Sequence, residues 1–386
     1  MGTRLSERHL KQLLLDCASD LGLEFIGITS AMPFQRAEEA AIERLRKGLM
    51  GLLPWYTENR VWRGTRPKEL LSDARSIISI AVDYLPETVE EGDGVGNPIL
   101  ACTKGRVARY AWGRDYHNVL KTRLNHLMKR FAEVSGLSFR FKVYVDDGPM
   151  IDREVAWRAG VGFYGKNTNV LTAIGSWVLL GQVITDLDLE HDQPTEKSCG
   201  TCVACIPACP TGAIVAPYVI DSNRCISYLT IENRGPIAPE LRPLLGDWVF
   251  GCDICQEVCP VNQLRGVITN ESEFCPEEPF DALELEEVLD FNEGQFREKF
   301  QGSPIRRATL TGLQRNACVV LGNSGDRSVV PVLIRALNTG SVIVRGHAAW
   351  ALGRLGGEVA LRALSDAQEH ESDASVLDEI RLAVPG

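Results

Sequence analysis

The N-terminal part of the chain alternates between helical and strand-like patterns of apolar residues. Residues 6–22, SERHLKQLLLDCASDLG, place apolar side chains at helical spacing, with Ser6 as the expected N-cap. Three apolar runs are typical of buried strands: EFIGIT (24–29), RSIISIAVDY (75–84) and FRFKVYV (139–145). Residues 115–136 predict a long helix between the last two. We therefore expect an α/β domain over residues 1–190.

The pattern changes twice further along the chain. Periodicity disappears over residues 191–265, where cysteine, proline and glycine recur closely, and residues 266–300 look like an acidic connecting segment. Beyond it, GLQRNACVVLGNSG (312–325) resembles VRGHAAWALGRLGG (344–357). At an offset of 31, Ala317, Leu321, Gly322 and Gly325 are matched by Ala348, Leu352, Gly353 and Gly356. This period indicates HEAT-type helical hairpins over residues 266–386, although two amphipathic helices can also share small residues by chance.

Charge and hydropathy narrow the class of protein. No apolar run reaches the ~20 residues of a membrane-spanning helix, and the first residues lack the apolar core of a signal peptide, so we expect a cytoplasmic protein with no membrane partner. The net charge of −10 argues against indiscriminate nucleic-acid binding, but basic residues gather in 101–130 and 301–357. Either run is a solvated helix face or a surface for an anion. An extended basic surface on stacked helices suits a nucleic acid.

Eight of the twelve cysteines carry the most specific chemical signal. CGTCVACIPACP (199–210) has the C-x2-C-x2-C-x3-C-P spacing of bacterial ferredoxins, and GCDICQEVCP (251–260) supplies three more thiols, with Cys225 upstream. By the exchange of the fourth ligand in two-cluster proteins, we expect two [4Fe-4S] clusters. The expected ligands are Cys199, Cys202, Cys205 and Cys259 for cluster 1, and Cys209, Cys225, Cys252 and Cys255 for cluster 2. Two zinc sites would also use eight thiolates, although paired C-x2-C knuckles are more usual for zinc.

The stretch AGVGFYGKNT (159–168) comes within one residue of a phosphate-binding loop. Such a loop follows a strand and begins a helix, whereas here a helical pattern precedes the glycines and strand-like residues follow them. Asn167 also stands where a Ser or Thr would bind magnesium. We expect a glycine-rich turn from helix to strand and no requirement for ATP.

Several motifs occur in an order that resembles one family. They are RYAWGRDYH (109–117), VDDGPMIDRE (145–154), RAGVGFYGKNT (158–168), the ferredoxin run, CISYLTIE (225–232), GCDICQEVCP and the helical repeats. Together they resemble the epoxyqueuosine reductases across nearly the whole chain. The resemblance implies an α+β multidomain protein with an N-terminal α/β cobalamin-binding domain similar to that of reductive dehalogenases, a two-cluster ferredoxin-like domain and C-terminal HEAT-like repeats.

The resemblance also implies an activity and its residues. Epoxyqueuosine at the wobble position of tRNA would be reduced to queuosine, with cobalamin and two [4Fe-4S] clusters as cofactors and an external electron donor, by a monomer. Asp146 is the expected proton donor, and Asp115 and His117 are expected to line the substrate side of the corrin. The residues expected to bind the cofactor are Arg109, Tyr110, Asp146, Lys166, Asn167, Thr168, Val170, Gly181, Ser227 and Asp253. Those expected to bind tRNA are Arg234, Arg306, Arg307, Arg315 and Arg345.

Each assignment competes with a simpler one. VDDGP is also an ordinary turn after a strand, and Asp115 is also a helix N-cap. Two other functions remain open at this point: a reductive dehalogenase-like corrinoid enzyme acting on a small molecule, and a nucleic-acid-binding protein whose clusters are structural. The C-terminal repeats favour a tRNA substrate over a small organohalide.

Overall fold

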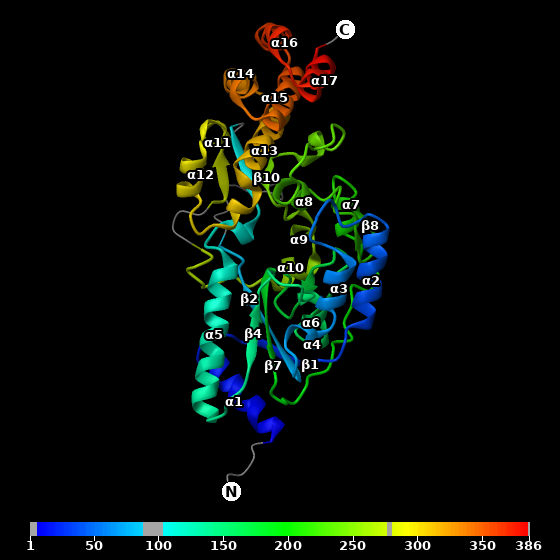
Figure 1. The fold of residues 1–386 in the computed structure, drawn as a ribbon, viewed down its shortest axis with the longest axis vertical. Helices are drawn as coiled ribbons and strands as arrows, with labels where there is room; N and C mark the ends of the chain where they lie inside the picture. Colours follow the sequence, from blue (N-terminus) through cyan, green and yellow to red (C-terminus); the bar gives the residue numbers. More distant parts are fainter. Residues whose placement is uncertain (1–5, 88–102, 276–279, 385–386) are drawn as a thin grey trace.

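The computed structural model describes residues 6–87, 103–275 and 280–384. The chain runs from a sheet-containing N-terminal unit at one end of the molecule, through the cysteine-rich segment, to a stack of helices at the other end (Figure 1). The N- and C-termini lie at opposite ends of the long axis. None of the helices in the described ranges is long and apolar enough to cross a membrane.

The N-terminal unit is built on a four-stranded sheet of order β1-β2-β7-β4. Its strands are β1 (Phe25–Ser30), β2 (Ser76–Asp83), β7 (Val178–Thr185) and β4 (Phe141–Tyr144), and every pairing between them is antiparallel. The three apolar runs that predict strands all lie in this sheet. Because β2 is central and covered on both faces, seven of its eight residues are buried.

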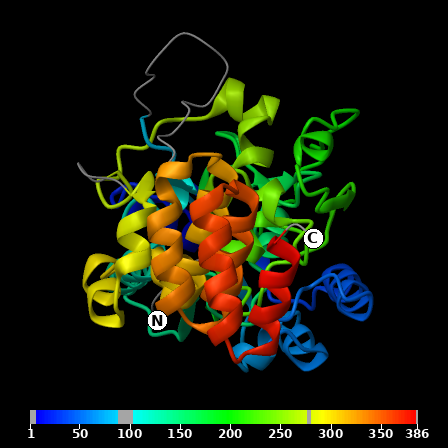
Figure 2. The same ribbon diagram turned by 90° about the horizontal axis from the view of Figure 1, so that it is seen from above.

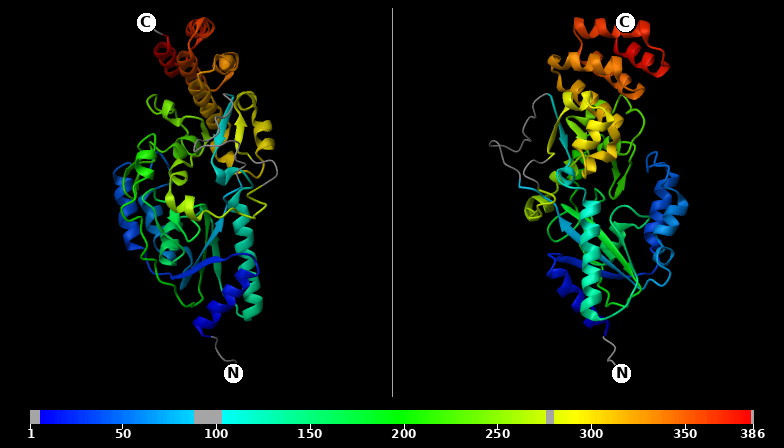
Figure 3. Two further views of the ribbon diagram at one scale, coloured as in Figure 1. Left: turned by 180° about the vertical axis from the view of Figure 1, so that it is seen from behind. Right: turned by 60° about the vertical axis from the view of Figure 1, so that its left-hand side comes forward.

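Helices cover the two faces of this sheet (Figure 3). On one face, α1 (Glu7–Ser19) packs against α5 (Tyr116–Ser135), and both share a core with alternate residues of β2 such as Ile78 and Ile80. On the other face, α6 (Asp152–Arg158) packs against β2 and β7, and a second core contains Ile77 and Val155. The segments α2 (Gln35–Arg46), α3 (Glu58–Gly64) and α4 (Pro67–Leu70) lie beyond it. Alternation along β2 thus divides the apolar side chains between two layers.

The cysteine-rich segment is compact and has little regular structure. It contains short helices and strands: α7 (Cys205–Ala208), β8 (Ile214–Ala216), β9 (Val219–Ile220), α8 (Ile226–Ile231), α9 (Ile254–Glu257) and α10 (Pro260–Arg265). The short helices inside the two cysteine motifs, α7 and α9, pack against each other. The two halves of the segment therefore face one another, as a two-cluster unit requires.

A three-stranded sheet joins parts of the chain that the sequence assigns to different domains. The strand β3 (Lys104–Val107) lies between β10 (Trp248–Phe250) and β11 (Ala282–Glu284). The segment expected to be a connection is therefore structured, since it supplies β11, α11 (Leu285–Asp290) and α12 (Glu293–Lys299). The expected domain boundaries at residues 190 and 265 stay predictions. Each of the three expected domains supplies one strand of this sheet, so the sheet does not separate them.

The helical stack continues with α13 (Thr309–Ser324), α14 (Val330–Thr339), α15 (Val342–Leu355), α16 (Glu358–His370) and α17 (Ala374–Ala383). The two copies of the repeat lie on α13 and α15, which pack side by side, and α17 extends the same layer (Figure 2). A Cβ atom on Gly322 would lie 2.9 Å from Ala351 of α15, and one on Gly353 would lie 2.5 Å from Ala383 of α17. The repeated glycine thus permits close approach of successive helices.

Candidate active site and cluster-binding region

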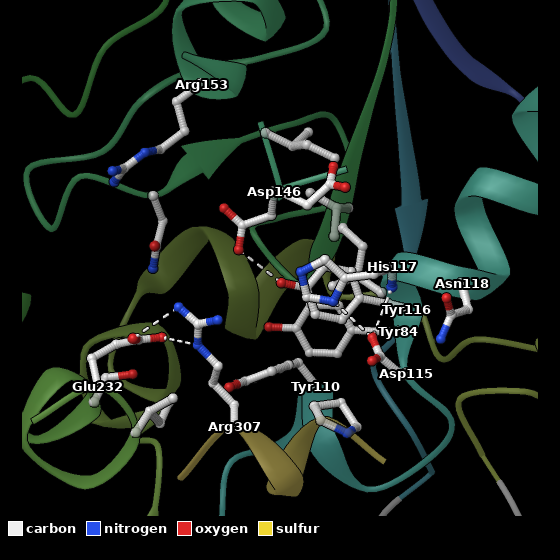
Figure 4. A pocket seen from close by; sticks show the side chains of 18 of the residues that line it. Tyr84, Tyr110, Asp115, Tyr116, His117, Asn118, Asp146, Arg153, Glu232 and Arg307 are labelled. Atoms are coloured by element: carbon white, nitrogen blue, oxygen red, sulfur yellow. Dashed lines mark hydrogen bonds and ion pairs between the residues drawn. The ribbon is translucent and has the colours of Figure 1, made fainter. Parts of the chain in front are cut away.

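A cavity of about 1110 Å³ opens where the central sheet, the cysteine-rich segment and the start of the helical stack meet. Its wall on the sheet side includes Val178 and Leu180 of β7. The beginning of α5 and the turn after β4 supply polar groups on a second side, and Ser227 and Glu232 of the α8 segment lie on a third. Figure 4 shows several of the lining side chains, among them Asp146, Glu232 and Arg307.

Asp146 lies in the turn that follows β4 and lines this cavity. Its φ of 50° is in the left-handed region, which a non-glycine residue seldom adopts without support. The hydroxyl of Tyr116 donates a hydrogen bond of 2.8 Å to Asp146 Oδ2 (Figure 4). Burial and the nearby Asp146 carboxylate raise the pKa of Tyr116, so this phenol stays protonated and keeps donating. The sequence prediction of an acid in this turn therefore corresponds to an exposed carboxyl group that lines the cavity.

Asp115 and His117 form a pair at the cavity edge. Asp115 is the N-cap of α5, as expected, and its Oδ1 accepts from the His117 backbone N–H at 3.0 Å. The same oxygen lies 2.7 Å from His117 Nδ1, and the imidazole stacks on the Tyr116 ring with centroids 4.1 Å apart. Burial alone would raise the pKa of Asp115, but the bonds from His117 lower it. Asp115 can therefore cap helix α5 and line the cavity at the same time.

Arg109 and Asp253 contact each other and are not among the cavity-lining residues. The guanidinium of Arg109 lies 3.2 Å from Asp253 Oδ2 and 2.7 Å from Glu257 Oε1. Burial raises the pKa of Asp253 to about 6, against the lowering effect of Arg109. This pair ties β3 and its following turn to the second cysteine motif, which is a structural use of two residues that the sequence assigned to the cofactor.

The glycine-rich turn also contacts the cysteine-rich segment. As the sequence predicts, it runs from α6 into a hairpin of β5 (Phe163–Tyr164) and β6 (Val170–Leu171), opposite to the order of a phosphate-binding loop. Lys166 Nζ donates to the carbonyls of Gly200 and Cys202, both at 2.8 Å, and Asn167 Nδ2 donates to Cys255 O at 3.1 Å. The turn therefore supports the loops that carry both cysteine motifs.

Of the residues expected to bind the cofactor, four line the cavity: Tyr110, Asp146, Val170 and Ser227. Lys166, Asn167 and Thr168 do not, and Thr168 accepts from Arg153 at 3.0 Å. Gly181 is also absent from the lining, because its side-chain direction points at Leu124 of α5, where a Cβ atom would lie only 2.6 Å from a methyl group. The prediction that Lys166, Asn167 and Thr168 of the glycine-rich turn bind the cofactor therefore has no support in these contacts.

The eight cysteines expected to bind the clusters are free thiols. Their mutual effects on pKa divide them into two neighbourhoods. Burial raises the pKa of Cys199, and the adjacent Cys259 and Cys202 thiols raise it further. Burial likewise raises the pKa of Cys252, and Cys255 and Cys225 raise it further. Burial also raises the pKa of Cys255, with further contributions from Cys225, Cys205 and Cys209. Because Ser227 and Gln256, which line the cavity, follow Cys225 and Cys255 closely in sequence, the second neighbourhood is the one beside the cavity.

Comparison with known proteins adds the family. The model described as "Epoxyqueuosine reductase QueG, DUF1730" matches residues 65–147, that of a 4Fe-4S double cluster binding domain matches 198–262, and that of HEAT repeats matches 306–384. An epoxyqueuosine reductase of Escherichia coli K12 is 37% identical over 355 residues, covering 92% of each chain. One from Pseudomonas aeruginosa is 39% identical, covering 90% of this chain and 95% of the relative.

The chain belongs to the epoxyqueuosine reductase family. A crystal structure of an epoxyqueuosine reductase with an epoxyqueuosine-modified tRNA-Tyr stem loop superimposes with a TM-score of 0.87 at 34% identity, covering 97% of this chain and 98% of that one. The family resemblance and the fold class expected from the motifs are thus confirmed. All eight cysteines fall within the double-cluster match, which sets the zinc alternative aside.

Four of the five arginines of this chain that are expected to bind tRNA divide into three groups. Arg306 and Arg307 line the cavity, and Arg307 forms a two-bond ion pair with Glu232 at 2.7 and 3.0 Å. Arg345 is paired in the same way with Glu371, at 2.7 and 2.9 Å. Arg234 donates to backbone carbonyls, including Arg307 O at 2.7 Å. Only the first group presents cationic groups directly to the cavity.

Arg315 is a correction. It is 1% exposed, so the surface position that the repeat pattern predicts for it is wrong. Its guanidinium donates to three backbone carbonyls at the end of the α8 segment, those of Leu229, Asn233 and Gly235, at 2.6 to 2.8 Å. The basic run over residues 301–357 is therefore not one continuous surface.

Sequence reasoning missed some of the cavity-lining residues. Tyr116 and Glu232 stand inside motifs that carry the family resemblance, so their positions were flagged but their side chains were not. Arg153, Asn169 and Gln256 also line the cavity. Arg153 and Gln256 also stand inside such motifs, but nothing in the spacing of these three residues shows that they line a cavity, because they reach it from a helix, a hairpin and a cysteine motif that only the tertiary structure brings together.

Proposed function

We propose that this chain reduces epoxyqueuosine to queuosine at the wobble position of tRNA. Converting an epoxide to an alkene takes two electrons and two protons and releases water. The cavity joins the three resources that this reaction needs: a carboxyl group at Asp146, residues adjoining the cluster ligands at Ser227 and Gln256, and cationic groups at Arg306 and Arg307. This convergence in one cavity is the observation that carries the proposal, and membership of the family supports it.

The cavity fits a corrinoid in size and in chemistry. At about 1110 Å³ it is slightly larger than most small-molecule sites, as a large cofactor requires. Its wall combines apolar side chains such as Val178 and Leu180 with neutral hydrogen-bonding groups. Asn169, Ser176, Ser227 and Gln256 provide those groups, which match amide side arms around a flat apolar ring. Bound cobalamin would supply a strongly reducing cobalt centre for the epoxide carbon. We infer that these residues, with Tyr110 and Val170, hold it.

Electrons would enter through the two [4Fe-4S] clusters. We propose Cys199, Cys202, Cys205 and Cys259 as ligands of cluster 1, and Cys209, Cys225, Cys252 and Cys255 as ligands of cluster 2. The proximity of Cys225 and Cys255 to cavity-lining residues supports cluster 2 as the one nearer the cofactor. Cys202 is exposed, which supports delivery of electrons to cluster 1 by a separate protein. We expect that donor, and not ATP, to drive the reaction.

Asp146 is the proposed proton donor to the departing epoxide oxygen. Its side chain faces the cavity, and the Tyr116 hydroxyl fixes one carboxyl oxygen at 2.8 Å, which leaves the other oxygen to carry and deliver the proton. His117, oriented by Asp115 through Nδ1, is the proposed second proton carrier. The ring stacks on Tyr116, so both groups belong to one polar cluster at the cavity edge.

The tRNA would approach from the side of the helical stack. Arg306 is exposed at the cavity rim, and Arg307 is half-exposed there in its pair with Glu232. A phosphate can displace a carboxylate from such a pair, because the guanidinium binds both anions in the same two-bond geometry. We expect the enzyme to act as a cytoplasmic monomer on tRNAs with a queuosine-type anticodon.

The decisive experiment is nucleoside mass analysis after anaerobic incubation with cobalamin, a strong reductant and epoxyqueuosine-containing tRNA. We expect the modified nucleoside to lose one oxygen, and we expect no change when cobalamin or the reductant is omitted. Binding of the tRNA without loss of oxygen in the complete mixture would instead favour a nucleic-acid-binding protein with structural clusters. Release of halide from an aryl halide, with the tRNA unchanged, would favour a dehalogenase-like enzyme.

A further inference from the structure

The turn that carries Asp146 is held by few bonds, although its backbone conformation is unfavourable. A non-glycine residue at positive φ costs about 1 kcal/mol and persists where surrounding contacts fix it. In this turn, the Val145 N–H donates to Asp147 Oδ1 at 3.0 Å, and Asp147 also pairs with Lys121. The Asp146 N–H donates to Asp152 Oδ2 at 3.2 Å. The backbone of Asp146 itself is thus restrained through Asp152.

Asp152 occupies an unusual position for a carboxyl group. It is the first residue of α6, and its Oδ1 is buried without a hydrogen-bond partner among the described residues. Gln182 of β7 donates only to the Asp152 backbone carbonyl, at 3.4 Å. Burial raises the pKa of Asp152 well above its usual range, and the charge of Asp146 adds to this effect. A proton on Oδ1 makes the group neutral while Oδ2 still accepts from the Asp146 N–H.

We propose that Asp152 is a positioning residue that fixes the turn carrying Asp146 through the hydrogen bond from the Asp146 N–H to Asp152 Oδ2. This inference rests on the proposed function, in which Asp146 donates a proton. Asp152 touches neither cofactor nor substrate, since it does not line the cavity. A neutral Asp152 also places no second negative charge behind Asp146 when that residue becomes anionic. A neutral Asp152 therefore accepts the hydrogen bond that holds the turn and adds no negative charge beside Asp146.

Two substitutions at Asp152 test this role, one that keeps a neutral acceptor for the Asp146 N–H and one that removes it. Asp152→Asn reproduces the neutral acid, because its amide oxygen accepts the Asp146 N–H and its NH2 group takes the place of the hydroxyl. Asp152→Ala removes the acceptor. We expect Ala to lower kcat by about 10-fold with little change in KM for tRNA, because misplacement of a reacting group costs rate without weakening binding elsewhere. We expect Asn to stay within about 3-fold of wild type.

A matched control removes a carboxylate elsewhere. Asp188→Asn breaks a half-exposed ion pair with Arg75 at 2.5 Å on the far side of the N-terminal unit from the cavity, and we expect wild-type kinetics. Melting temperature and iron content show whether each variant is folded and carries its clusters. The Asn variant keeps the test valid even where Ala loses stability, since Asn preserves the hydrogen bond.

Hydrogen–deuterium exchange of the segment 145–151 gives a reading that does not require turnover. We expect faster exchange at the Asp146 amide in Asp152→Ala, and wild-type exchange in Asp152→Asn. Equal loss of kcat in Ala and Asn, or wild-type kcat in Ala, overturns the proposal, and so does unchanged exchange in Ala. If the wild-type chain fails to reduce epoxyqueuosine at all, the proposed function fails, whereas the exchange data still decide whether Asp152 holds the turn.

Discussion

Replacing Arg315 by methionine tests the most unexpected contact in the molecule. Arg315 of α13 is buried, and burial lowers its pKa to about 10, yet no carboxylate accompanies it among the described residues that it bonds to. Its guanidinium instead satisfies the carbonyls of Leu229, Asn233 and Gly235, where α8 ends. Methionine fills similar space but offers no donor.

The magnitude follows from the carbonyls of Leu229 and Asn233, which lose the Arg315 donor, since the carbonyl of Gly235 also accepts from Asn233 Nδ2 at 3.2 Å. Each buried acceptor left without a partner costs about 1 to 3 kcal/mol, and relief from burying an unpaired cation offsets part of that sum. We expect Arg315→Met to lower the free energy of unfolding by about 3 kcal/mol. If the chain unfolds as one unit, the entropy of unfolding of 386 residues converts this into a fall in melting temperature of about 4 °C.

The assay is thermal unfolding followed by circular dichroism on anaerobic, cluster-loaded protein. Arg335→Ala is the control, because Arg335 lies in the same stack but forms a half-exposed pair with Asp290 at 2.9 Å, which contributes less than about 1 kcal/mol. Hydrogen exchange over residues 229–235 should rise in Arg315→Met alone. A melting temperature within 1 °C of the Arg335→Ala value would refute the reasoning, since it would mean that the carbonyls of Leu229 and Asn233 find other donors.

The remaining predictions concern the site and its surroundings. Asp146→Asn should abolish loss of oxygen from the nucleoside while the corrinoid and cluster absorption bands remain; retained turnover would exclude its acid role. Cys199→Ala should remove about half of the iron, and unchanged iron content would contradict the ligand assignment. Burial lowers the pKa of His347 to about 3, so the unfolded chain binds an extra proton between roughly pH 6.5 and 3, and stability must fall as the pH falls through that window. Denaturation at pH 7 and 5 should show a smaller loss for His347→Gln than for wild type. Arg306→Ala should weaken tRNA binding and reduce its salt dependence by about one counterion, whereas an unchanged salt slope would place the phosphate elsewhere.

The sequence predicts most of the architecture for physical reasons that can be stated. The strands β1, β2 and β4 and the helices α1 and α5 have clear apolar periodicity, and the cysteine spacing is dictated by cluster geometry, which leaves little freedom. The glycine-rich turn was also predictable, because the order of helix and strand around it excludes a phosphate loop. These features depend on local sequence.

The site was less predictable because its contacts are not local. Lys166 and Asn167 look like ligands for a cofactor, but their partners are carbonyls 34 to 88 residues away. Arg315 looks exposed in an arginine-rich run until the position of α8 is known. Asp152 stands in a quoted motif, and nothing in the spacing reveals that its carboxyl group meets the Asp146 backbone. Charged residues that satisfy distant backbone groups give the same sequence signal as charged residues that bind ligands.

The three-stranded sheet bears on how the chain is made in the cell. Arg106 of β3 pairs with Ala282 of β11, about 175 residues later, and with Trp248 of β10 in between. At a synthesis rate of about 5 to 20 residues per second, β3 leaves the ribosome roughly 10 to 35 seconds before its last partner does. All eight motif cysteines emerge within that interval. The sheet therefore closes only after every cluster ligand has become accessible to the assembly machinery, and this delay gives metal loading a period in which the surrounding walls are still open.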